Sequence, residues 1–305
     1  MAKKKYEYFT YEVDGYIIES KHPDKLYWPE AGITKRDLMD YYNEMGDYMI
    51  RFLKDRPLTL HFFPYGIHRF SFYKRDYDIK APKEFIEVYL YQEKSQDKVL
   101  RVPVVKNKAG LVYLGSRGCL EIHAWASRYP HFDKPDFVVF DMDASDEVPF
   151  EKIIKATNLL HKKLEKLNLV SYVKTSGGSG IHVYIPVKLG YSFDEVRAWA
   201  TQLAEQLADE HPDFITTIKR QRKSHAGDKV VIDFMQNVIT RNTAAPYSPR
   251  ANPEARVSTP LKWEEVNKGG FTPSDFTMKT VPERVKKIGD LFADILEHPQ
   301  ILPGL

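Results

Sequence analysis

The sequence predicts an α+β protein whose centre is one sheet built in the order β-α-β-β-α-β. Two observations predict this order. Apolar runs of strand length alternate with two segments of helical periodicity, and polar residues of a few chemical types recur at the ends of the strands. Apolar residues make up 43% of the 305 residues, which is enough for a substantial core. No internal repeat or low-complexity linker interrupts the chain.

The first strand of this sheet is predicted at residues 136–143, where an apolar run ends in Asp141 and Asp143. Side chains alternate across a strand, so these two carboxylates share a face. Carboxylates side by side repel each other unless a cation lies between them, and hard oxygen ligands are what Mg²⁺ or Mn²⁺ takes. For a bare Asp-x-Asp, the alternative interpretation is a strand that runs into a polar loop.

A helix at residues 151–167 follows, with apolar side chains at helical spacing. Strands at 171–175 and 181–187 then enclose a glycine-rich turn. This turn is not a phosphate loop, because no Gly-Lys-Ser/Thr follows and no helix opens after it. We expect a hairpin with Ser176 at its entrance and His182 on the outgoing strand, and a plain tight turn is the alternative interpretation.

The second helix is predicted to begin at Ser192, which forms a capping box with Glu195, and to stop near Pro212. The last strand, at residues 229–235, carries Asp233 within an apolar run. A charge inside a buried strand is costly unless it is paired or binds a metal. A partly exposed strand end is the alternative here.

This order of elements is the ferredoxin-like arrangement that RNA-recognition modules also use. In the usual strand order of that fold, the first strand lies between the last and the third. Asp141 and Asp143 would then have Asp233 on one neighbouring strand and His182 on the other. The sequence therefore predicts that three carboxylates and one histidine converge on one face of the sheet.

Eight motifs in order extend the pattern to nearly the whole chain, from about Ile17 to about Ile288. The chain resembles the polymerase domain of bacterial ligase D, a member of the archaeo-eukaryotic primase superfamily that works in non-homologous end joining. The resemblance implies a primase-type catalytic core with an N-terminal β-rich lobe packed against it. It rests on the segments 23–29, 32–38, 72–74, 121–123, 140–143, 176–182, 231–233 and 245–250.

The resemblance implies a role for each matched residue. Asp141, Asp143 and Asp233 match a metal-binding triad, which would hold two Mn²⁺ or Mg²⁺ ions that activate the primer 3′-hydroxyl and clamp the triphosphate. The nucleotide-binding positions line the triphosphate and sugar pocket, and they are His123, Ser176, His182 and Arg250. Without the resemblance, His123 would be interpreted as a core histidine and Arg250 as a solvated loop residue.

Lys25 and Lys35 match the pair that holds the 5′-phosphate at a DNA gap or end. Lys35 lies in the first turn of a helix capped by Thr34, where the helix dipole also favours an anion. Phe72 and Tyr73 match aromatic residues that stack on template bases. Without the resemblance, the lysines would be ordinary surface residues and the aromatics would be core residues of a strand.

Two features depart from the family pattern or go beyond it. Ser179 stands where many relatives carry a lysine in the glycine hairpin, so one phosphate contact is missing or comes from elsewhere. A basic run just before the last strand fits a loop that contacts triphosphate or primer, although a solvated face is the alternative. That run consists of Lys219, Arg220, Arg222, Lys223 and His225.

Length and composition favour one catalytic unit over two ordinary domains. We expect an N-terminal lobe at 1–130 that is β-rich after a helix at 34–54, an RRM-like core at 131–245 and a C-terminal wrap at 246–305. Net charge is only +3, so nucleic-acid binding depends on local patches. The single cysteine, together with the lack of a membrane-spanning stretch and of a signal peptide, predicts a cytoplasmic, nucleoid-associated protein.

The resulting prediction is a template-directed polymerase that adds nucleotides, preferentially ribonucleotides, to 3′ ends at gapped or overhanging double-stranded DNA. Its partners would be nucleoside triphosphates and DNA with a downstream 5′-phosphate, with a Ku-like protein and a DNA ligase in the same repair. A de novo primase, a non-catalytic end-bridging module and a metal-dependent nuclease are the alternatives. No Lys-x-Asp-Gly ligase motif is present, so a stand-alone polymerase and a fragment of a larger ligase both stay open.

Overall fold

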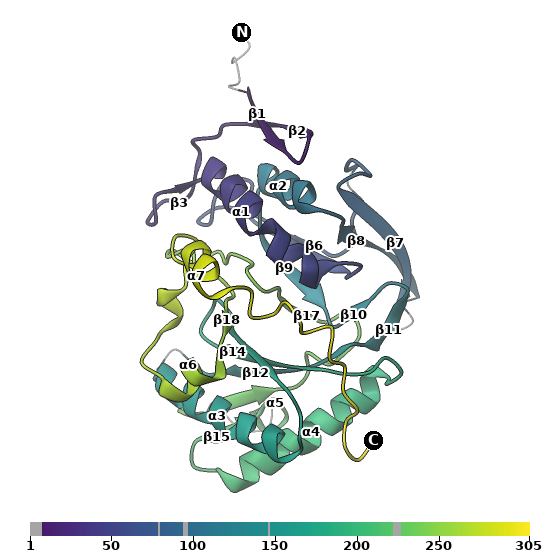
Figure 1. Ribbon diagram of the computed structural model, residues 1–305, viewed down its shortest axis with the longest axis vertical. Coiled ribbons are helices and arrows are strands. Elements are labelled where there is room, and N and C mark those ends of the chain that lie inside the picture. Colours follow the sequence, from purple (N-terminus) through teal and green to yellow (C-terminus); the bar gives the residue numbers. More distant parts are fainter. Residues whose placement is uncertain (1–7, 79, 94–96, 146, 222–226) are drawn as a thin grey trace.

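The computed structural model describes residues 8–78, 80–93, 97–145, 147–221 and 227–305. These residues form two lobes, one above the other in Figure 1. The upper lobe holds two helices and a four-stranded sheet, and the lower lobe holds a six-stranded sheet with two long helices. The mixed α+β class agrees with the class predicted from the sequence.

The N-terminal lobe is built on α1 (Lys35–Leu53), which Thr34 caps, as predicted, in a capping box with Asp37. Its four-stranded sheet has the order β17-β9-β5-β6. The strands of this lobe are β1 (Tyr8–Val13), β2 (Tyr16–Lys21), β3 (Leu26–Trp28), β4 (Ile33–Thr34), β5 (Leu58–Phe62), β6 (Phe72–Lys74), β7 (Ile86–Glu93), β8 (Lys98–Val105), β9 (Cys119–Trp125), β10 (Ser127–Arg128), β11 (His131–Pro135) and β17 (Asn242–Ala244).

A second helix of this lobe, α2 (Lys108–Ser116), was not predicted. Nearly all of its residues are buried, between α1 and the sheet, so apolar and small residues occur on every side of it. A helix that is buried all round has no amphipathic period, and the period is the signal by which a helix is read from sequence. The N-terminal lobe is therefore less purely β than the sequence suggested.

The predicted β-α-β-β-α-β elements are all present. They are β12 (Phe137–Asp143), α3 (Phe150–Lys166), β13 (Tyr172–Thr175), β14 (Ile181–Pro186), α4 (Phe193–Glu210) and β16 (Val230–Asp233). The strand order β15-β16-β12-β14-β13-β18 places the first strand between the last and the third, as predicted. Two edge strands that were not predicted, β15 (Ile215–Thr217) and β18 (Pro260–Leu261), widen the sheet.

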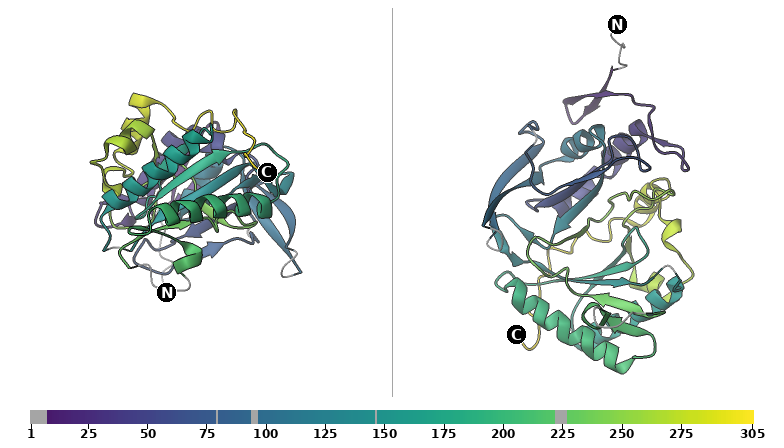
Figure 2. Two further views of the ribbon diagram at one scale, coloured as in Figure 1. Left: turned by 90° about the horizontal axis from the view of Figure 1, so that it is seen from below. Right: turned by 180° about the vertical axis from the view of Figure 1, so that it is seen from behind.

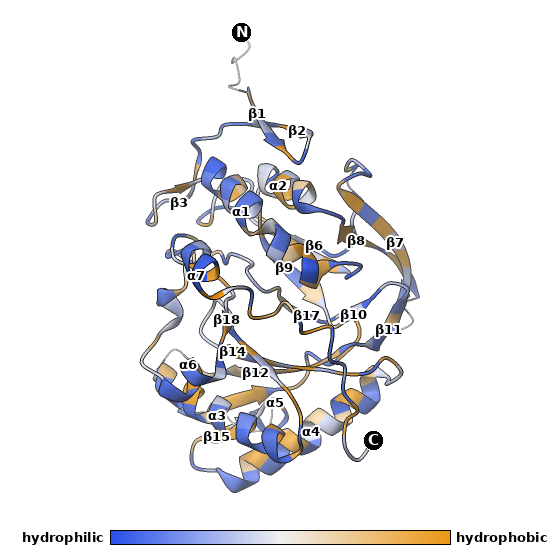
Figure 3. Cartoon of the chain, in the orientation of Figure 1, coloured by the Kyte–Doolittle hydropathy of each residue, from blue (hydrophilic) through white to orange (hydrophobic). Residues whose placement is uncertain are grey.

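The two faces of this sheet have different coverings. Seen from below, α3 and α4 lie across the outer face (Figure 2), where Phe140 of β12 packs near Trp199 of α4. Hydrophilic and hydrophobic residues alternate along α4, as expected of an amphipathic helix (Figure 3). On the other face, Phe137 stacks on Phe52 of α1 with ring centroids 5.6 Å apart. Asp141 shares that face with Phe137, so it points towards the N-terminal lobe.

A buried ion pair joins the lobes beside this contact. The guanidinium of Arg56 is fully buried and donates to both carboxylate oxygens of Asp136, at 2.7 and 2.8 Å. Its plane also lies near the rings of Phe52 and Phe137, each 4.8 Å away. A bidentate pair held between aromatic rings fixes the relative position of the two lobes.

The segment after residue 245 contacts both lobes. The Tyr41 hydroxyl of α1 donates to the carbonyl of Tyr247, and the Trp199 indole of α4 donates to the carbonyl of Pro303. The short helix α5 (Ile218–Gln221) precedes this segment, which itself contains α6 (Trp263–Lys268), the 3₁₀ helix η1 (Pro273–Asp275) and α7 (Val281–Ile288). Within the described part of the chain, no helix is both long and apolar enough to cross a membrane.

Candidate functional site

The strand register brings the predicted carboxylates and histidine together. Asp141 on β12 lies directly opposite Asp233 on β16 and opposite His182 on β14. Residues opposite each other in an antiparallel pair project to the same face. The pairing thus places these three side chains in one row across three adjacent strands, and Asp143 lies two residues further along the same face of β12.

A glycine leaves space beside two of these carboxylates. A Cβ on Gly180 would lie 3.5 Å from Asp141 Oδ1 and 3.4 Å from Asp143 Oδ1. It would also meet the carbonyl oxygen of Met142 at 2.6 Å, which is too close for real atoms. The absence of a side chain at this position therefore keeps open a space that both carboxylates border.

The donor set fits a divalent cation in chemistry. Three carboxylates on neighbouring strands supply the hard oxygen atoms that Mg²⁺ and Mn²⁺ take, and Gly180 leaves space at their side. Among the described residues, no three His, Cys, Asp or Glu side chains are gathered around one point as a complete ligand group. Asp143 Oδ1 instead accepts hydrogen bonds from Ser179 Oγ and from the Ala144 amide, both at 2.9 Å. Ser179, the residue in place of a lysine, thus contacts a predicted metal ligand.

His182 is held between Asp141 and a buried lysine that the sequence reasoning missed. Its Nε2 lies 3.4 Å from Asp141 Oδ1, and its Nδ1 lies 2.8 Å from the ammonium of Lys174. The lysine also donates to Ser258 Oγ at 2.5 Å and has no exposed surface. Where Lys174 donates to this ring, His182 accepts at Nδ1 and carries its proton on Nε2, which faces Asp141.

Burial and charge shift the pKa values of this row in consistent directions. Burial and the nearby Lys174 together lower the pKa of His182 to about 4. Burial also lowers the pKa of Lys174 well below its ordinary value, and the charge of Arg250 acts in the same direction. For Asp141, burial raises the pKa, but His182 and the two cations outweigh it and lower the pKa overall. Asp141 is thus an ionised carboxylate beside a neutral imidazole.

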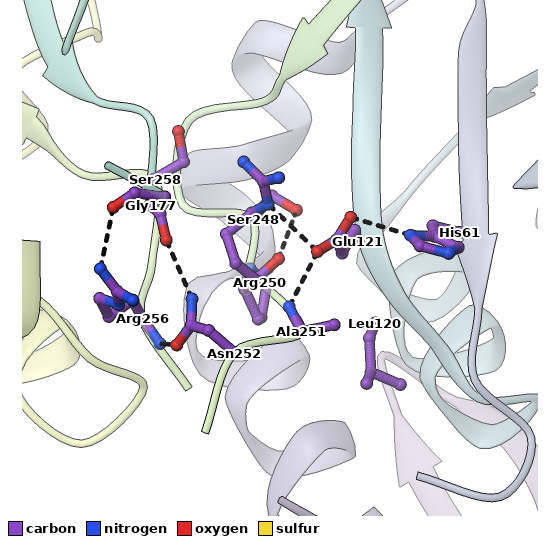
Figure 4. Close-up of polar contacts among 12 residues, drawn as sticks. His61, Leu120, Glu121, Gly177, Ser248, Arg250, Ala251, Asn252, Arg256 and Ser258 are labelled. Carbon is purple, nitrogen blue, oxygen red and sulfur yellow. Dashed lines mark hydrogen bonds and ion pairs between the residues drawn. The ribbon is translucent and has the colours of Figure 1, made fainter. Parts of the chain in front are cut away.

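The glycine hairpin is held from one side by three side chains of the C-terminal segment. The successive carbonyls of residues 176–178 accept hydrogen bonds from Arg250 at 2.8 Å, Asn252 at 3.0 Å and Arg256 at 3.0 Å. Figure 4 shows the bond from Asn252 to Gly177. Gly177 has a φ of +72°, and a Cβ there would meet Arg250 Cγ at 2.6 Å. The sequence reasoning identified Arg250 but missed Asn252 and Arg256.

The Ser176 side chain turns inward to its own hairpin. Its Oγ accepts hydrogen bonds from the amides of Gly178 at 3.0 Å and Gly180 at 3.1 Å. The hydroxyl therefore closes the hairpin and retains its own hydrogen as a donor. The predicted role of Ser176 in nucleotide binding stays a prediction.

His123 lies in the other sheet, on the opposite side of Arg250. It is almost completely buried on β9, and its Nε2 lies 3.1 Å from the Glu121 carboxylate. Burial lowers its pKa, although Glu121 opposes that shift. Arg250 bridges the two sheets, because its Nε donates to Glu121 at 3.2 Å while its Nη1 reaches the Ser176 carbonyl. Arg250 therefore contacts Ser176 directly and is linked to His123 through Glu121.

The structure separates the two predicted template aromatics. Tyr73 on β6 is 57% exposed and stacks on the His61 ring with centroids 3.7 Å apart. Phe72, its neighbour, points to the other face of the strand and stacks on Phe62. Only Tyr73 of this pair presents an open ring near His123, at 6.1 Å.

The predicted phosphate-binding lysines lie apart from this site, near the start of α1. Lys35 borders a cavity of about 320 Å³, and its ammonium contacts the carbonyls of Ser116 at 2.8 Å and Lys21 at 3.0 Å. The Lys25 ammonium donates to the carbonyl of Pro64, which lines the same cavity. Burial, with the charges of Lys25 and Arg117, lowers the pKa of Lys35 to about 8. Lys21 and Arg117 line this cavity together with Lys35 and Glu19, and the sequence reasoning missed Arg117.

The basic run before β16 is only partly within the described residues. Arg220 on α5 donates to Glu205 and to Asp209 of α4, so its charge is already paired within the protein. Three predicted members of the run, at positions 222, 223 and 225, lie outside the described residues. A role of this run in binding triphosphate or primer stays a prediction.

Comparison with known proteins gives one family for this chain. Residues 34–292 match the model of the LigD primase-polymerase domain. The chain is 30% identical over 281 residues to the bifunctional non-homologous end joining protein LigD of Bacillus subtilis, covering 92% of this chain and 44% of that protein. It is 27% identical to the multifunctional LigD of Pseudomonas aeruginosa, over 91% of this chain and 32% of that protein.

A solved structure agrees with these matches. The polymerase domain of Mycobacterium tuberculosis ligase D in complex with DNA superposes with a TM-score of 0.83 at 25% identity, and the match covers 91% of this chain and 97% of that one. The chain spans less than half the length of the curated relatives that it matches.

Proposed function

The chain belongs to the LigD primase-polymerase domain family, and from this premise we propose that it is a template-directed nucleotidyltransferase of DNA end joining. It would add nucleotides, preferentially ribonucleotides, to the 3′ end at gapped or broken DNA ends. The names of the relatives support the repair pathway, and the solved relative, which was captured in complex with DNA, supports contact with DNA. The polymerase activity and its substrates are part of the proposal.

One observation carries the proposal more than any other. The register places Asp141 between Asp233 and His182, next to the space that Gly180 leaves open. Asp141, Asp143 and Asp233 would hold the divalent ions, which supply charge neutralisation at the triphosphate and a lower pKa for the primer hydroxyl. A strand that merely ends in a polar loop has no need for three carboxylates on one face of the sheet.

The other side chains of the site would position the nucleotide. The Nε and Nη1 atoms of Arg250 each donate a hydrogen bond within the protein, which fixes the orientation of the guanidinium. Its remaining N–H groups would donate to a phosphate group. His182, with its proton on Nε2, and the Ser176 hydroxyl would donate to other phosphate oxygens. His123 would face the sugar, and the open ring of Tyr73 would stack on a template base.

The lysine cavity would receive the 5′-phosphate on the far side of a gap. Among the described residues, no carboxylate forms an ion pair with Lys25 or Lys35. This cavity favours gap filling over de novo priming, because a primase has no downstream strand to hold. An intact row of carboxylates argues against a non-catalytic end-bridging module. A Ku-like protein and a DNA ligase are the partners that this reaction would require in repair.

The test is primer extension on a duplex with a short gap in the presence of Mn²⁺, with a 5′-phosphate or a 5′-hydroxyl on the downstream strand. We expect templated addition that is stronger with the phosphate, stronger with ribonucleotides, and absent from Asp141→Asn. Extension by Asp141→Asn at the normal rate would refute the proposed catalytic site. Addition that ignores the 5′-phosphate would favour the primase, and DNA binding without any addition would favour the end-bridging module.

A further inference from the structure

One buried carboxylate of the four-stranded sheet contacts both sides of the proposed site. Glu121 on β9 is 4% exposed, and its Oε2 lies 3.0 Å from His61 Nδ1 and 3.1 Å from His123 Nε2. Its Oε1 accepts hydrogen bonds from Arg250 Nε at 3.2 Å and from the Ala251 amide at 2.8 Å (Figure 4). A carboxylate offers about four acceptor positions, so these four donors use all of them.

The charge of Glu121 determines how its neighbours are protonated. Burial raises the pKa of this carboxyl, but the hydrogen bonds from the two histidines and the charge of Arg250 outweigh burial and lower the pKa overall. An ionised carboxylate is an acceptor only. His61 must therefore carry a proton on Nδ1, and His123 must carry one on Nε2, wherever each contacts Glu121.

Each oxygen of Glu121 leads to a different part of the site. Through Oε2 it holds His61, whose ring supports the exposed Tyr73 at 3.7 Å and whose Nε2 contacts Ser71 Oγ at 3.2 Å. Through Oε1 it holds Arg250, whose Nη1 binds the carbonyl of Ser176 in the glycine hairpin. The template side and the triphosphate side thus depend on the same carboxylate.

We propose that Glu121 is a positioning residue that sets the orientation of Arg250 for the triphosphate and of His61 for the Tyr73 stack. This role rests on the proposed function. A glutamine at this position would accept through one atom and donate through the other. Two of the four donors would then face an N–H group, so either the Arg250 side or the histidine side must move, although the volume is unchanged.

The experiment compares Glu121→Gln with the matched control Glu265→Gln, which removes one charge from a carboxylate paired with Arg284 far from the site. Steady-state extension on the gapped duplex is measured for both. For Glu121→Gln we expect the KM of the incoming nucleotide to rise about tenfold or more, with a smaller fall in kcat, which is the loss of a positioned charge-assisted contact. Glu265→Gln is expected to leave both parameters within about twofold of the unaltered protein.

A double-mutant cycle shows whether Glu121 acts through Arg250. Arg250→Lys keeps the charge but cannot donate to Glu121 and Ser176 as a planar fork. If Glu121 acts by orienting that fork, adding Glu121→Gln to Arg250→Lys raises the KM by less than about threefold. Multiplication of the two separate effects would overturn the proposal, as would an unchanged KM in Glu121→Gln.

A second measurement needs no substitution and covers the case in which Glu121→Gln does not fold. In ¹⁵N-histidine NMR spectra of the unaltered protein, we expect His61 protonated at Nδ1 and His123 at Nε2. Addition of a ribonucleotide with Ca²⁺ should shift the His61 resonance, although His61 lies on the template side. The opposite tautomers, or a His61 chemical shift that does not change when the nucleotide is added, would overturn the proposal. Failure of the proposed function is distinguishable, because the unaltered protein would then show no Asp141-dependent extension.

Discussion

Two regions of this molecule gather like charges, and they neutralise those charges in different ways. In the carboxylate row, His182 Nε2 lies 3.4 Å from Asp141 Oδ1, and the charges of Lys174 and Arg250 help to lower the pKa of Asp141. In the lysine cavity, the Lys35 ammonium contacts two carbonyls and the hydroxyl of Ser20, which are all neutral acceptors. Burial there lowers the pKa of Lys35 to about 8.

The difference indicates the charge of the ligand that each region would bind. The protein itself keeps Asp141 ionised before anything binds, so the row is prepared to receive cations. In the lysine cavity, which Glu19 and Lys21 also line, the hydrogen bonds that the Lys35 ammonium makes to described residues all go to neutral oxygens, and a buried charge held only by neutral groups is costly. In the proposed function, the ligand of this cavity is a DNA 5′-phosphate. Substitutions in either region therefore test this contrast.

The largest effect is expected from filling the space beside the carboxylates. In Gly180→Ala, the new methyl group would meet the Met142 carbonyl and crowd both Asp141 and Asp143. We expect extension to fall by at least about 100-fold, as for other losses of preorganised electrostatic groups. Binding of Mn²⁺, followed by electron paramagnetic resonance, should weaken in parallel.

Gly178→Ala is the matched control, because it makes the same change in the same hairpin. A Cβ there would meet only Ser176 Oγ, at 3.3 Å. We expect at most a few-fold loss of extension. Equal losses in the two variants would show that the hairpin tolerates no side chain at all. The space beside the carboxylates would then not be a specific requirement for extension.

The second prediction concerns the buried cation of the carboxylate row. In Lys174→Met, His182 loses the donor at Nδ1 and can turn or change its tautomer. We expect extension to fall about tenfold to 100-fold, the range of a mispositioned catalytic contact, with DNA binding retained. Lys155→Met, which alters an exposed lysine of α3 near Phe214, should have no effect on extension. Loss of DNA binding in Lys174→Met would point to a role in the fold instead.

The sheet was predictable because its signals are local. Strand lengths, the helical spacing of α3 and the capping box of α4 are all visible within short windows, and the order of elements then leaves few topologies. The positions of Asp141, Asp233 and His182 followed from strand order alone. The helix α2 was not predictable in this way, because its buried surroundings leave no period in the sequence.

The supporting residues of the site were not predictable, because their partners are distant in sequence. Lys174 contacts Ser258, 84 residues away, and Glu121 contacts Arg250, 129 residues away. In the sequence, Lys174 is a charged residue at the end of a short strand, and Glu121 is the residue two before a matched histidine. Which charged side chains are buried depends on packing between elements, and no window of sequence contains that packing.

The third prediction tests the lysine cavity. Lys35→Ala and Lys25→Ala should each reduce the preference for a downstream 5′-phosphate about tenfold, since each removes a charge-assisted contact worth about 1.4 kcal/mol. Extension on the 5′-hydroxyl duplex should change little, because the cavity lies away from the carboxylate row. Lys287→Ala, an exposed lysine of α7, is the control and should keep the full preference. An equal loss on both duplexes would place these lysines in general DNA binding.

The smallest expected effect is a pH dependence of the same preference. The folded pKa of Lys35, about 8, lies below its ordinary value of 10.5, because burial and the neighbouring cations disfavour the charged form. A phosphate binds the charged form. As the pH rises from about 7 to about 9, Lys35 loses its proton in the empty cavity. Binding of the phosphate must then be accompanied by uptake of a proton on Lys35. The ratio of extension with phosphate to extension with hydroxyl should therefore fall a few-fold over this range.

The ratio cancels any pH effect on the chemistry, which both substrates share. Lys35→Arg keeps its charge throughout and should show a flat ratio. A ratio that falls equally in Lys35→Arg would assign the pH dependence to another group and leave the cavity with an ordinary, fully charged lysine.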